Sequence, residues 1–247
     1  MVLIYYTMSD KNIRAKRPYT NKPMHPQDAK KTSMFFEKLV KTFYDASPYG
    51  KDAVTNHELE VKFGTKSVRP HTKIDYDNVI RKLKSLGFSS TYEDGYYLLR
   101  ISYEYLDKSG QYKDSNIRVE ITGFRAIQEY CKTNDLMKLM NVPQYASSVK
   151  FVKKAPVYQN NDMVRDVNFY DFNFRVSYKK EEDISPSSVI IRSMLQNWRQ
   201  VKKTYRYINR VSFSKDATPL LFDISIVKSS AKEGYNLKKT YSTEESG

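Results

Sequence analysis

The chain has 247 residues, with 42 Lys and Arg against 28 Asp and Glu, so its formal net charge is +14. Hydrophobic residues make up 40% of it and aromatic residues 14%, which excludes a chain that stays disordered throughout. No apolar run reaches the ~18 residues of a membrane-spanning helix, so we expect a soluble protein with no membrane partner. The single cysteine, Cys131, allows no internal disulfide and fits an intracellular, reducing compartment.

Histidine is as scarce as cysteine, with only His25, His57 and His71. A structural zinc site and a Ser/His/Asp triad therefore have almost no residues from which they could be built. Any metal must be held by carboxylates, which favours hard ions such as Mg²⁺ or Mn²⁺.

The positive charge has two explanations. A net charge of +14 attracts polyanions such as nucleic acids. The chain is also rich in Lys, Tyr, Asn and Ile and poor in Ala and Gly, a bias that an A+T-rich genome produces without selection for binding. The total charge alone therefore does not establish a function, and the positions of the charges have to be considered.

In chain order, residues 1–31 carry basic residues and three prolines with little periodicity, and they predict a flexible basic N-terminal arm. Residues 32–247 are predicted to form one domain, because no repeat or linker divides them. Apolar residues at helical spacing predict helices over residues 33–44, 76–86, 124–132 and 191–198. Alternation with period two predicts eight strands, at residues 57–63, 96–105, 116–122, 148–153, 168–179, 203–213, 219–228 and 235–243.

The fold class that follows is α+β: mainly antiparallel strands closing into a tunnel-like barrel, with a few flanking helices. In the first of these strands, residues 57–63, Leu59 and Val61 share an apolar face, while Glu58, Glu60 and Lys62 share the other. The two carboxylates lie ~7 Å apart on that face and repel unless a cation such as a divalent metal lies between them. We therefore expect Glu60→Ala to lose metal binding while the fold stays intact.

The same division into an apolar and a polar face recurs in later strands, where arginine often takes the central polar position. The simpler explanation is an antiparallel sheet whose polar face meets water. Solvated faces, however, more often carry a mixture of Thr, Lys, Glu and Ser, whereas the planar guanidinium of arginine suits phosphate oxygens. If the polar faces point into a barrel, the lining beside Glu58 and Glu60 suits a polyphosphate and comprises Lys62, Arg100, Arg118, Arg175, Lys179, Arg206 and Arg210.

The segment Glu58-Leu59-Glu60-Val61-Lys62 has an ExExK pattern that resembles the first strand of the triphosphate tunnel metalloenzymes. Followed by Phe63-Gly64, it is similar to the RNA 5′-triphosphatase domain of the mRNA capping enzymes of large DNA viruses. Further similar segments follow in the same order within about residues 33–245: Arg118-Val119-Glu120, residues 173–177, residues 198–210 and residues 222–228.

This resemblance implies metal-dependent hydrolysis of the γ-phosphate of 5′-triphosphate RNA, the first step of mRNA capping. It implies that Glu58 and Glu60 hold Mg²⁺ or Mn²⁺. The other residues assigned to catalysis or to substrate binding are Lys62, Arg100, Arg118, Arg175, Lys179, Arg206, Arg210 and Lys228. The partners implied are 5′-triphosphate RNA or a nucleoside triphosphate, and downstream guanylyltransferase and methyltransferase domains, in the host cytoplasm or the virion.

Two features depart from the family's pattern. Alternation places Lys228 on the face opposite Asp223, unless a bulge intervenes. Family members also use glutamates of a second ExE strand, whereas the only acidic residues after Lys228 are Glu233, Glu244 and Glu245. We therefore expect either a fragment of a larger capping enzyme or a tunnel without the last acidic strand, with triphosphate binding retained and hydrolysis reduced.

Other interpretations stay open. Glu120 orients an arginine or the attacking water, or it is simply a salt-bridge partner, which is the simpler reading. A non-catalytic basic module that binds RNA or polyphosphate is the alternative from another class, with aromatic rings stacking on bases. In these strands the aromatic residues mostly oppose the arginines, which favours the tunnel. A tunnel-fold protein that binds polyphosphate or a nucleotide without acting on RNA is a third possibility.

Overall fold

The structure is a computed structural model that describes residues 2–9, 30, 33–34, 37–38, 41, 56–63, 72–92, 94–107, 109–159, 161–169, 174–216, 218 and 220–230. Its Cα positions fall into two compact units. Unit 1 comprises Met1–Thr91, Ala155–Glu181 and Ser212–Ser225, and unit 2 comprises Tyr92–Lys154, Glu182–Val211 and Ile226–Gly247. Because each unit is assembled from three separate segments, no single boundary in the sequence marks the division.

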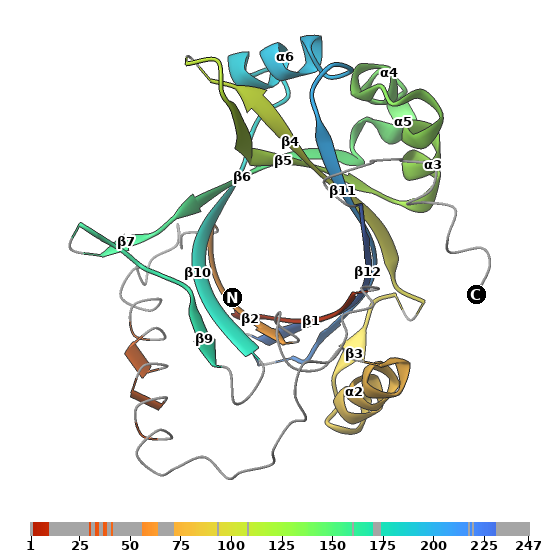
Figure 1. Ribbon diagram of the computed structural model, residues 1–247. Helices are drawn as coiled ribbons and strands as arrows, with labels where there is room; N and C mark the ends of the chain where they lie inside the picture. The colour runs from red at the N-terminus through yellow and green to blue at the C-terminus, as the bar shows by residue number, and fades with distance from the viewer. Residues whose placement is uncertain are drawn as a thin grey trace. The chain divides into compact units, whose positions relative to one another are not determined.

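Unit 1 is built on strands β1 (Val2–Ser9) and β2 (His57–Phe63) and on most of β10 (Phe174–Asp183), together with β9 (Val167–Phe169) (Figure 1). β2 pairs with β10 and β10 with β9, both antiparallel. It also contains helix α2 (Lys73–Ser85) and the short strands β3 (Ser89–Ser90), β7 (Tyr158–Gln159) and β8 (Asp162–Met163). The apolar face of β2 packs against β10 in a cluster of Leu59, Val61, Val157, Val176 and Tyr178.

Strand β1 corrects the prediction of a flexible arm over residues 1–31. Residues Val2–Ser9 form a strand that pairs with β2 in parallel, with Val2 opposite Leu59 and Tyr6 opposite Phe63. Residues 2–6 are all apolar or aromatic, which suits a strand, but they do not alternate with polar residues and so were not recognised as one. The rest of the predicted arm lies almost entirely outside the described residues.

Unit 2 contains the antiparallel strands β6 (Val149–Pro156), β5 (Tyr112–Thr122), β4 (Tyr96–Leu106) and most of β11 (Lys203–Ser214), paired in that order. Its helices are α3 (Phe124–Thr133), α4 (Leu136–Met140), α5 (Pro143–Ala146) and α6 (Val189–Gln196). The last strand, β12 (Leu220–Ser229), has residues in both units, as do β6, β10 and β11.

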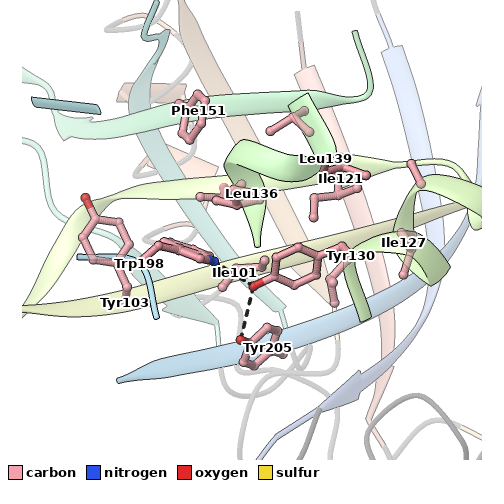
Figure 2. Packing of buried hydrophobic residues seen from close by; sticks show 14 of the residues in the cluster. Ile101, Tyr103, Ile121, Ile127, Tyr130, Leu136, Leu139, Phe151, Trp198 and Tyr205 are labelled. Carbon is pink, nitrogen blue, oxygen red and sulfur yellow. Dashed lines mark hydrogen bonds between the residues drawn. The ribbon is translucent and has the colours of Figure 1, made fainter. Parts of the chain in front are cut away.

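The core of unit 2 is a cluster of buried side chains from these strands and helices, with Tyr130, Trp198 and Tyr205 at its centre (Figure 2). Trp198 Nε1 donates a hydrogen bond to Tyr130 Oη at 3.1 Å, and the hydroxyls of Tyr130 and Tyr205 lie 3.4 Å apart. The polar atoms of three large aromatic side chains are therefore satisfied inside an otherwise apolar core.

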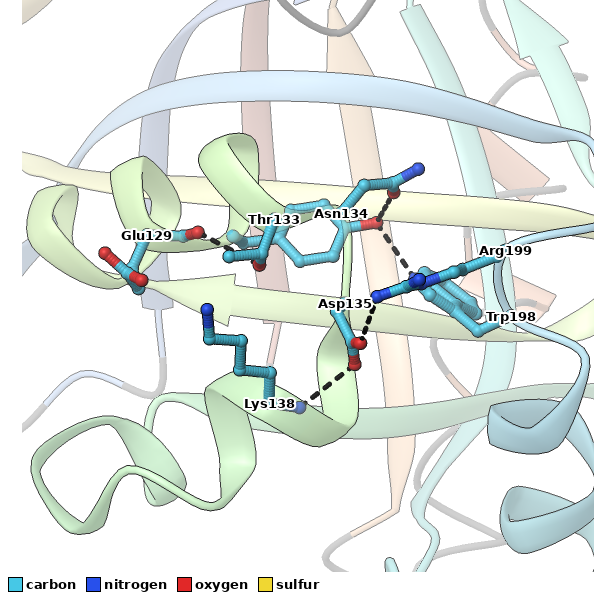
Figure 3. Close-up of polar contacts among 8 residues, drawn as sticks. Glu129, Thr133, Asn134, Asp135, Lys138, Trp198 and Arg199 are labelled. Atoms are coloured by element: carbon cyan, nitrogen blue, oxygen red, sulfur yellow. Dashed lines mark hydrogen bonds and ion pairs between the residues drawn. The ribbon is translucent and has the colours of Figure 1, made fainter.

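A second group of polar contacts joins the start of α4 to the segment after α6 (Figure 3). Asp135 accepts hydrogen bonds from the Lys138 backbone N–H at 3.0 Å and from Arg199 Nη2 at 2.9 Å. These two donors lower the pKa of Asp135 from its usual value, the Lys138 N–H contributing more. The carboxylate thus caps α4 and stabilises the position of the segment around Arg199.

The predicted α+β class, with one mainly antiparallel sheet and a few helices, is confirmed. β12 pairs with both β1 and β11. The single strand predicted over residues 168–179 is wrong, because that range contains parts of two strands, β9 and β10, which pair with each other in antiparallel. Of the predicted helix 33–44, five residues are described and all are helical, whereas the strand 235–243 lies outside the described residues. Within the described part of the chain, no helix is long and apolar enough to cross a membrane.

Candidate functional site

The polar face of β2 lies in unit 1 and carries Glu58, Glu60 and Lys62, as alternation predicts. Glu60 is buried, with 4% of its surface exposed. Lys62 Nζ lies 2.5 Å from its Oε2, and Ser177 Oγ donates a hydrogen bond to the same atom at 3.1 Å. Lys62 is therefore a cation that offsets the charge of Glu60, where the sequence suggested a divalent metal in this role.

Strand β10 places a complementary row of side chains beside those of β2, on the same side of the sheet. In the β2–β10 register, Arg175 is opposite Lys62, Ser177 is opposite Glu60 and Lys179 is opposite Glu58. Side chains directly opposite on neighbouring antiparallel strands have Cβ atoms ~5 Å apart, so the three pairs form one polar surface.

Asp166, just before β9, is a member of this surface that the sequence did not reveal. Its Oδ1 lies 2.8 Å from Lys179 Nζ, and its Oδ2 lies 3.9 Å from Arg175 Nη1. No alternation surrounds Asp166, because it lies in a connection between two short strands, and so no pattern pointed to it. With Asp166, this surface has three cations and three carboxylates, and its formal charge is balanced.

Glu58 and Glu60 suit a hard divalent ion whose other ligands are water and phosphate oxygens. Mg²⁺ is usually held by one or two carboxylates plus water and phosphate oxygens, and two carboxylates on one strand face match that mode. Within the described residues, no three His, Cys, Asp or Glu side chains gather where they could hold an ion by themselves. Glu58 and Glu60 would therefore hold Mg²⁺ or Mn²⁺ together with a phosphate, once Glu60 exchanged Lys62 for the ion.

In unit 2 a second row of polar side chains crosses four strands. The registers of β11, β4, β5 and β6 place Arg206 opposite Arg100, Arg100 opposite Glu120, and Glu120 opposite Lys150. Arg118 stands on the same face of β5, two residues from Glu120. Lys150 Nζ also lies 3.8 Å from Asp183 Oδ2, so four cations stand against two carboxylates. This row, unlike the surface in unit 1, therefore has an excess of positive charge that suits an anion without a metal.

Glu120 holds two of these arginines in place. Its Oε1 lies 2.8 Å from Arg100 Nε and 2.7 Å from Arg118 Nε. All three side chains are less than one fifth exposed, which strengthens the two ion pairs. The structure favours the reading of Glu120 as a partner that orients arginines.

The arginine-bearing face of unit 2 also has an apolar part. Leu98, Ile208 and Val227 are buried together there. Because Val227 packs on this side, alternation along β12 turns Lys228 to the other face, away from Arg100 and Arg206. Arg210 is on the arginine-bearing face by alternation and is 6% exposed. The backbone at Gly95 lies close to that of Arg210, since a Cβ at Gly95 would be 2.7 Å from the Arg210 carbonyl oxygen.

Two further polar groups belong to unit 1. His57 Nδ1 lies 2.6 Å from Tyr178 Oη, and burial, followed by the charge of Lys180, lowers the pKa of this histidine. His57 is therefore mostly neutral near pH 7 and adds little charge beside Glu58. Asp223, a buried carboxylate on β12, accepts a hydrogen bond from Ser212 Oγ at 2.5 Å.

No protein-family model matches the sequence, and a search of curated proteins finds no match. Similar solved structures include the triphosphatase part of a viral mRNA capping enzyme. Among them are the Mimivirus capping enzyme triphosphatase in a triclinic crystal form (16% identity, 80% of each chain covered, TM-score 0.48) and in a monoclinic form (16%, 80% of each, 0.49). The RNA triphosphatase domain of the trifunctional Mimivirus mRNA capping enzyme is also similar (18%, 79% of this chain and 78% of that one, 0.46).

These neighbours are proteins of the kind that the sequence motifs resemble. With identities of 16–18% and TM-scores below 0.5, they carry no argument about activity. Any assignment of activity has to rest on the polar surface of unit 1 and the arginine row of unit 2.

Proposed function

We propose that the protein hydrolyses the γ-phosphate of 5′-triphosphate RNA with Mg²⁺ or Mn²⁺, the first step of mRNA capping. The observation that carries the proposal is the polar surface of unit 1. There Lys62, Glu60 and Glu58 on β2 lie opposite Arg175, Ser177 and Lys179 on β10. Cationic side chains bind phosphate oxygens, and carboxylates bind a divalent ion. A surface that carries both therefore suits a phosphate that arrives with such an ion.

In the reaction, a water oxygen forms a bond to the γ-phosphorus while the bond to the β–γ bridging oxygen breaks, which releases inorganic phosphate. A bound ion supplies positive charge to the phosphate oxygens as negative charge moves between them. Lys62, Arg175 and Lys179 bind and orient those oxygens by charge-assisted hydrogen bonds. Asp166 is a positioning residue, because it contacts Arg175 and Lys179.

The row in unit 2 has a separate role in this proposal. Arg100, Arg118 and Arg206, with Arg210, bind phosphate groups of a triphosphate or of the RNA backbone, and Glu120 orients two of them. Lys228 is left out, since alternation turns it to the other face of β12. Guanylyltransferase and methyltransferase domains of a larger capping enzyme, and a location in the host cytoplasm or the virion, belong to the same proposal.

One observation favours a second function, the binding of RNA or polyphosphate without hydrolysis. The carboxylate of Glu60 is already occupied by Lys62 and Ser177, so an ion has to compete with a bound ammonium group. A version of this alternative in which bases stack on β11 has less support. Tyr205 and Tyr207 are buried in the core, while Arg206 between them is exposed.

The test is the release of phosphate from 5′-triphosphate RNA with Mg²⁺, with Mn²⁺ and with a chelator. We expect release only with an ion, and about a hundredfold less in Glu60→Gln, whose binding of the RNA is nearly unchanged. Arg175→Ala should weaken binding about tenfold, whereas Arg125→Ala, which changes an exposed arginine of α3, should have no effect. Binding without release under every ion condition would leave the non-catalytic alternative.

A further inference from the structure

A pocket of about 930 Å³ opens within unit 2, away from the residues assigned above. One wall is the β4–β5 hairpin, and the other is α6 with the segment that follows it. Its lining includes three tyrosines, Tyr103, Tyr105 and Tyr112, and three side-chain amides, from Asn116, Asn197 and Gln200. A volume of this size is ample for a small organic ligand.

The lining is nearly neutral, in contrast to the arginine row on the same strands. Among the described residues that line the pocket there is no Lys or Arg, and Glu104 is the only acidic residue. Lys202 Nζ lies 3.6 Å from Glu104 Oε1 and offsets its charge. A phosphate therefore gains little in this pocket, which suits the uncharged part of a ligand.

The side chains that line the pocket are those that bind flat heteroaromatic rings. Tyr105 and Tyr112 are 44% and 70% exposed, so their rings are accessible for stacking. Side-chain amides both donate and accept hydrogen bonds, as the edge of a base requires. We propose that this pocket binds a nucleobase. Its identity as a base of the RNA substrate rests on the proposed function.

The pocket lies on the side of the sheet that packs against α6. Tyr103 and Met194, which line it, belong to the same apolar cluster as Ile101 and Val119. Arg100 and Arg118 alternate with these two residues and therefore lie on the opposite face of the sheet. The pocket is thus separate from the arginine row, and its ligand is held by the lining alone.

The protein carries its own reporter of binding, because Trp198 is its single tryptophan. The ring of Trp198 lies 6.1 Å from that of Tyr103, a residue of the pocket wall. Uncharged nucleosides are suitable probes, since they lack the phosphates that the arginine row attracts. We expect adenosine or guanosine to change the fluorescence of Trp198 in a saturable way, with an affinity that added salt hardly alters.

Variants of the exposed Tyr105 test the site without disturbing the core. Tyr105→Ala should weaken nucleoside binding about tenfold, and Tyr105→Phe, which keeps the ring, should restore it. Tyr158→Ala, which removes a tyrosine of unit 1 that is 62% exposed, should have no effect. The proposal is overturned if no nucleoside binds, if Tyr105→Ala binds as well as the wild type, or if only an apolar peptide occupies the pocket.

The same titrations separate this proposal from the proposed function. Nucleoside binding that depends on Tyr105, together with no hydrolysis of 5′-triphosphate RNA, would support the pocket and reject the triphosphatase. Hydrolysis without any nucleoside binding would reject the pocket alone.

Discussion

Glu60 is buried at the centre of the polar surface of unit 1, and its neighbours determine what its removal costs. Lys62 and Ser177 both contact its Oε2, so the side chain stabilises the fold as well as serving the proposed site. The expectation that Glu60→Ala leaves the fold intact assumed two repelling carboxylates without a cation. The structure shows a buried, paired carboxylate instead.

We therefore expect Glu60→Ala to lower the free energy of unfolding by about 1–3 kcal/mol, because Ser177 and Lys62 lose their acceptor. Glu60→Gln should cost less, since an amide oxygen can still accept the hydrogen bond from Ser177. Urea unfolding of both variants measures the difference. If the two variants unfolded at the same urea concentration as the wild type, the contacts of Glu60 would contribute nothing to stability.

Lys203 is a buried lysine in the core of unit 2, 6% exposed, whose Nζ lies 4.9 Å from the centre of the Trp198 ring. Burial lowers the pKa of its ammonium group from 10.5 to about 8. Between these two values the unfolded chain binds more protons than the folded one, so stability rises with pH across this range. Below about pH 8 both states are protonated, and the full cost of burying the charge is present.

Lys203→Met should remove this dependence, since methionine fills similar space without a charge. We expect the variant to be more stable than the wild type at pH 7, and the difference to shrink steadily as pH rises from about 8 towards 10.5. Thermal or urea unfolding at several pH values tests this. Comparing the two proteins cancels the titration of the tyrosines, and a difference that stayed constant with pH would contradict the assignment.

At the scale of single elements, helix α2 shows how local sequence can determine structure. Thr72 Oγ1 accepts a hydrogen bond from the Asp75 backbone N–H at 3.3 Å, and Asp75 Oδ2 accepts one from the Thr72 N–H at 2.9 Å. This reciprocal arrangement is a capping box, and it satisfies two backbone donors at the start of the helix.

Thr72→Ala should lower stability by about 1 kcal/mol, because the N-cap acceptor is lost. Thr72→Ser keeps that oxygen and should retain most of the stability, which makes it a matched control. Neither change should alter phosphate release, since α2 carries no residue of the proposed site. Equal stability of the alanine variant and the wild type would show that the cap is not needed.

Alternation was sufficient to predict β2 from His57 to Phe63 and to place Glu60, Lys62 and Arg175 on polar faces. It succeeds where one face of a strand packs on a core, because burial then imposes a period of two. It failed for β1 and Asp166, whose positions depend on pairing and contacts with distant parts of the chain. It also missed Leu98, an apolar residue on the face assigned to arginine.

For the whole molecule, the question is whether the net charge of +14 serves binding or only reflects composition. If it serves binding, the cations that matter are those of the polar rows, and exposed ones elsewhere contribute little. The affinity for single-stranded 5′-triphosphate RNA should then fall steeply with salt, because bound phosphates release counterions.

We expect Arg118→Ala to reduce the slope of log affinity against log salt concentration by about 0.7, the value for one phosphate contact on a single strand. Arg125→Ala, which removes the same charge from the exposed surface of α3, should leave the slope unchanged. Filter binding or fluorescence anisotropy over a range of salt concentrations measures both. Equal effects of the two substitutions would favour the compositional explanation.

The pairing of β1 with β12 has a consequence for the synthesis of this protein. β1 leaves the ribosome first, but its partner begins only at Leu220, so at ~5–20 residues per second the first strand waits roughly 10–40 s for it. Both units also need residues beyond position 211, so no growing chain can complete one unit before starting the other. During that interval the edge of β1 that will pair with β12 stays open to chaperones or to neighbouring chains, and the sheet can be completed only after Leu220–Ser229 has been made.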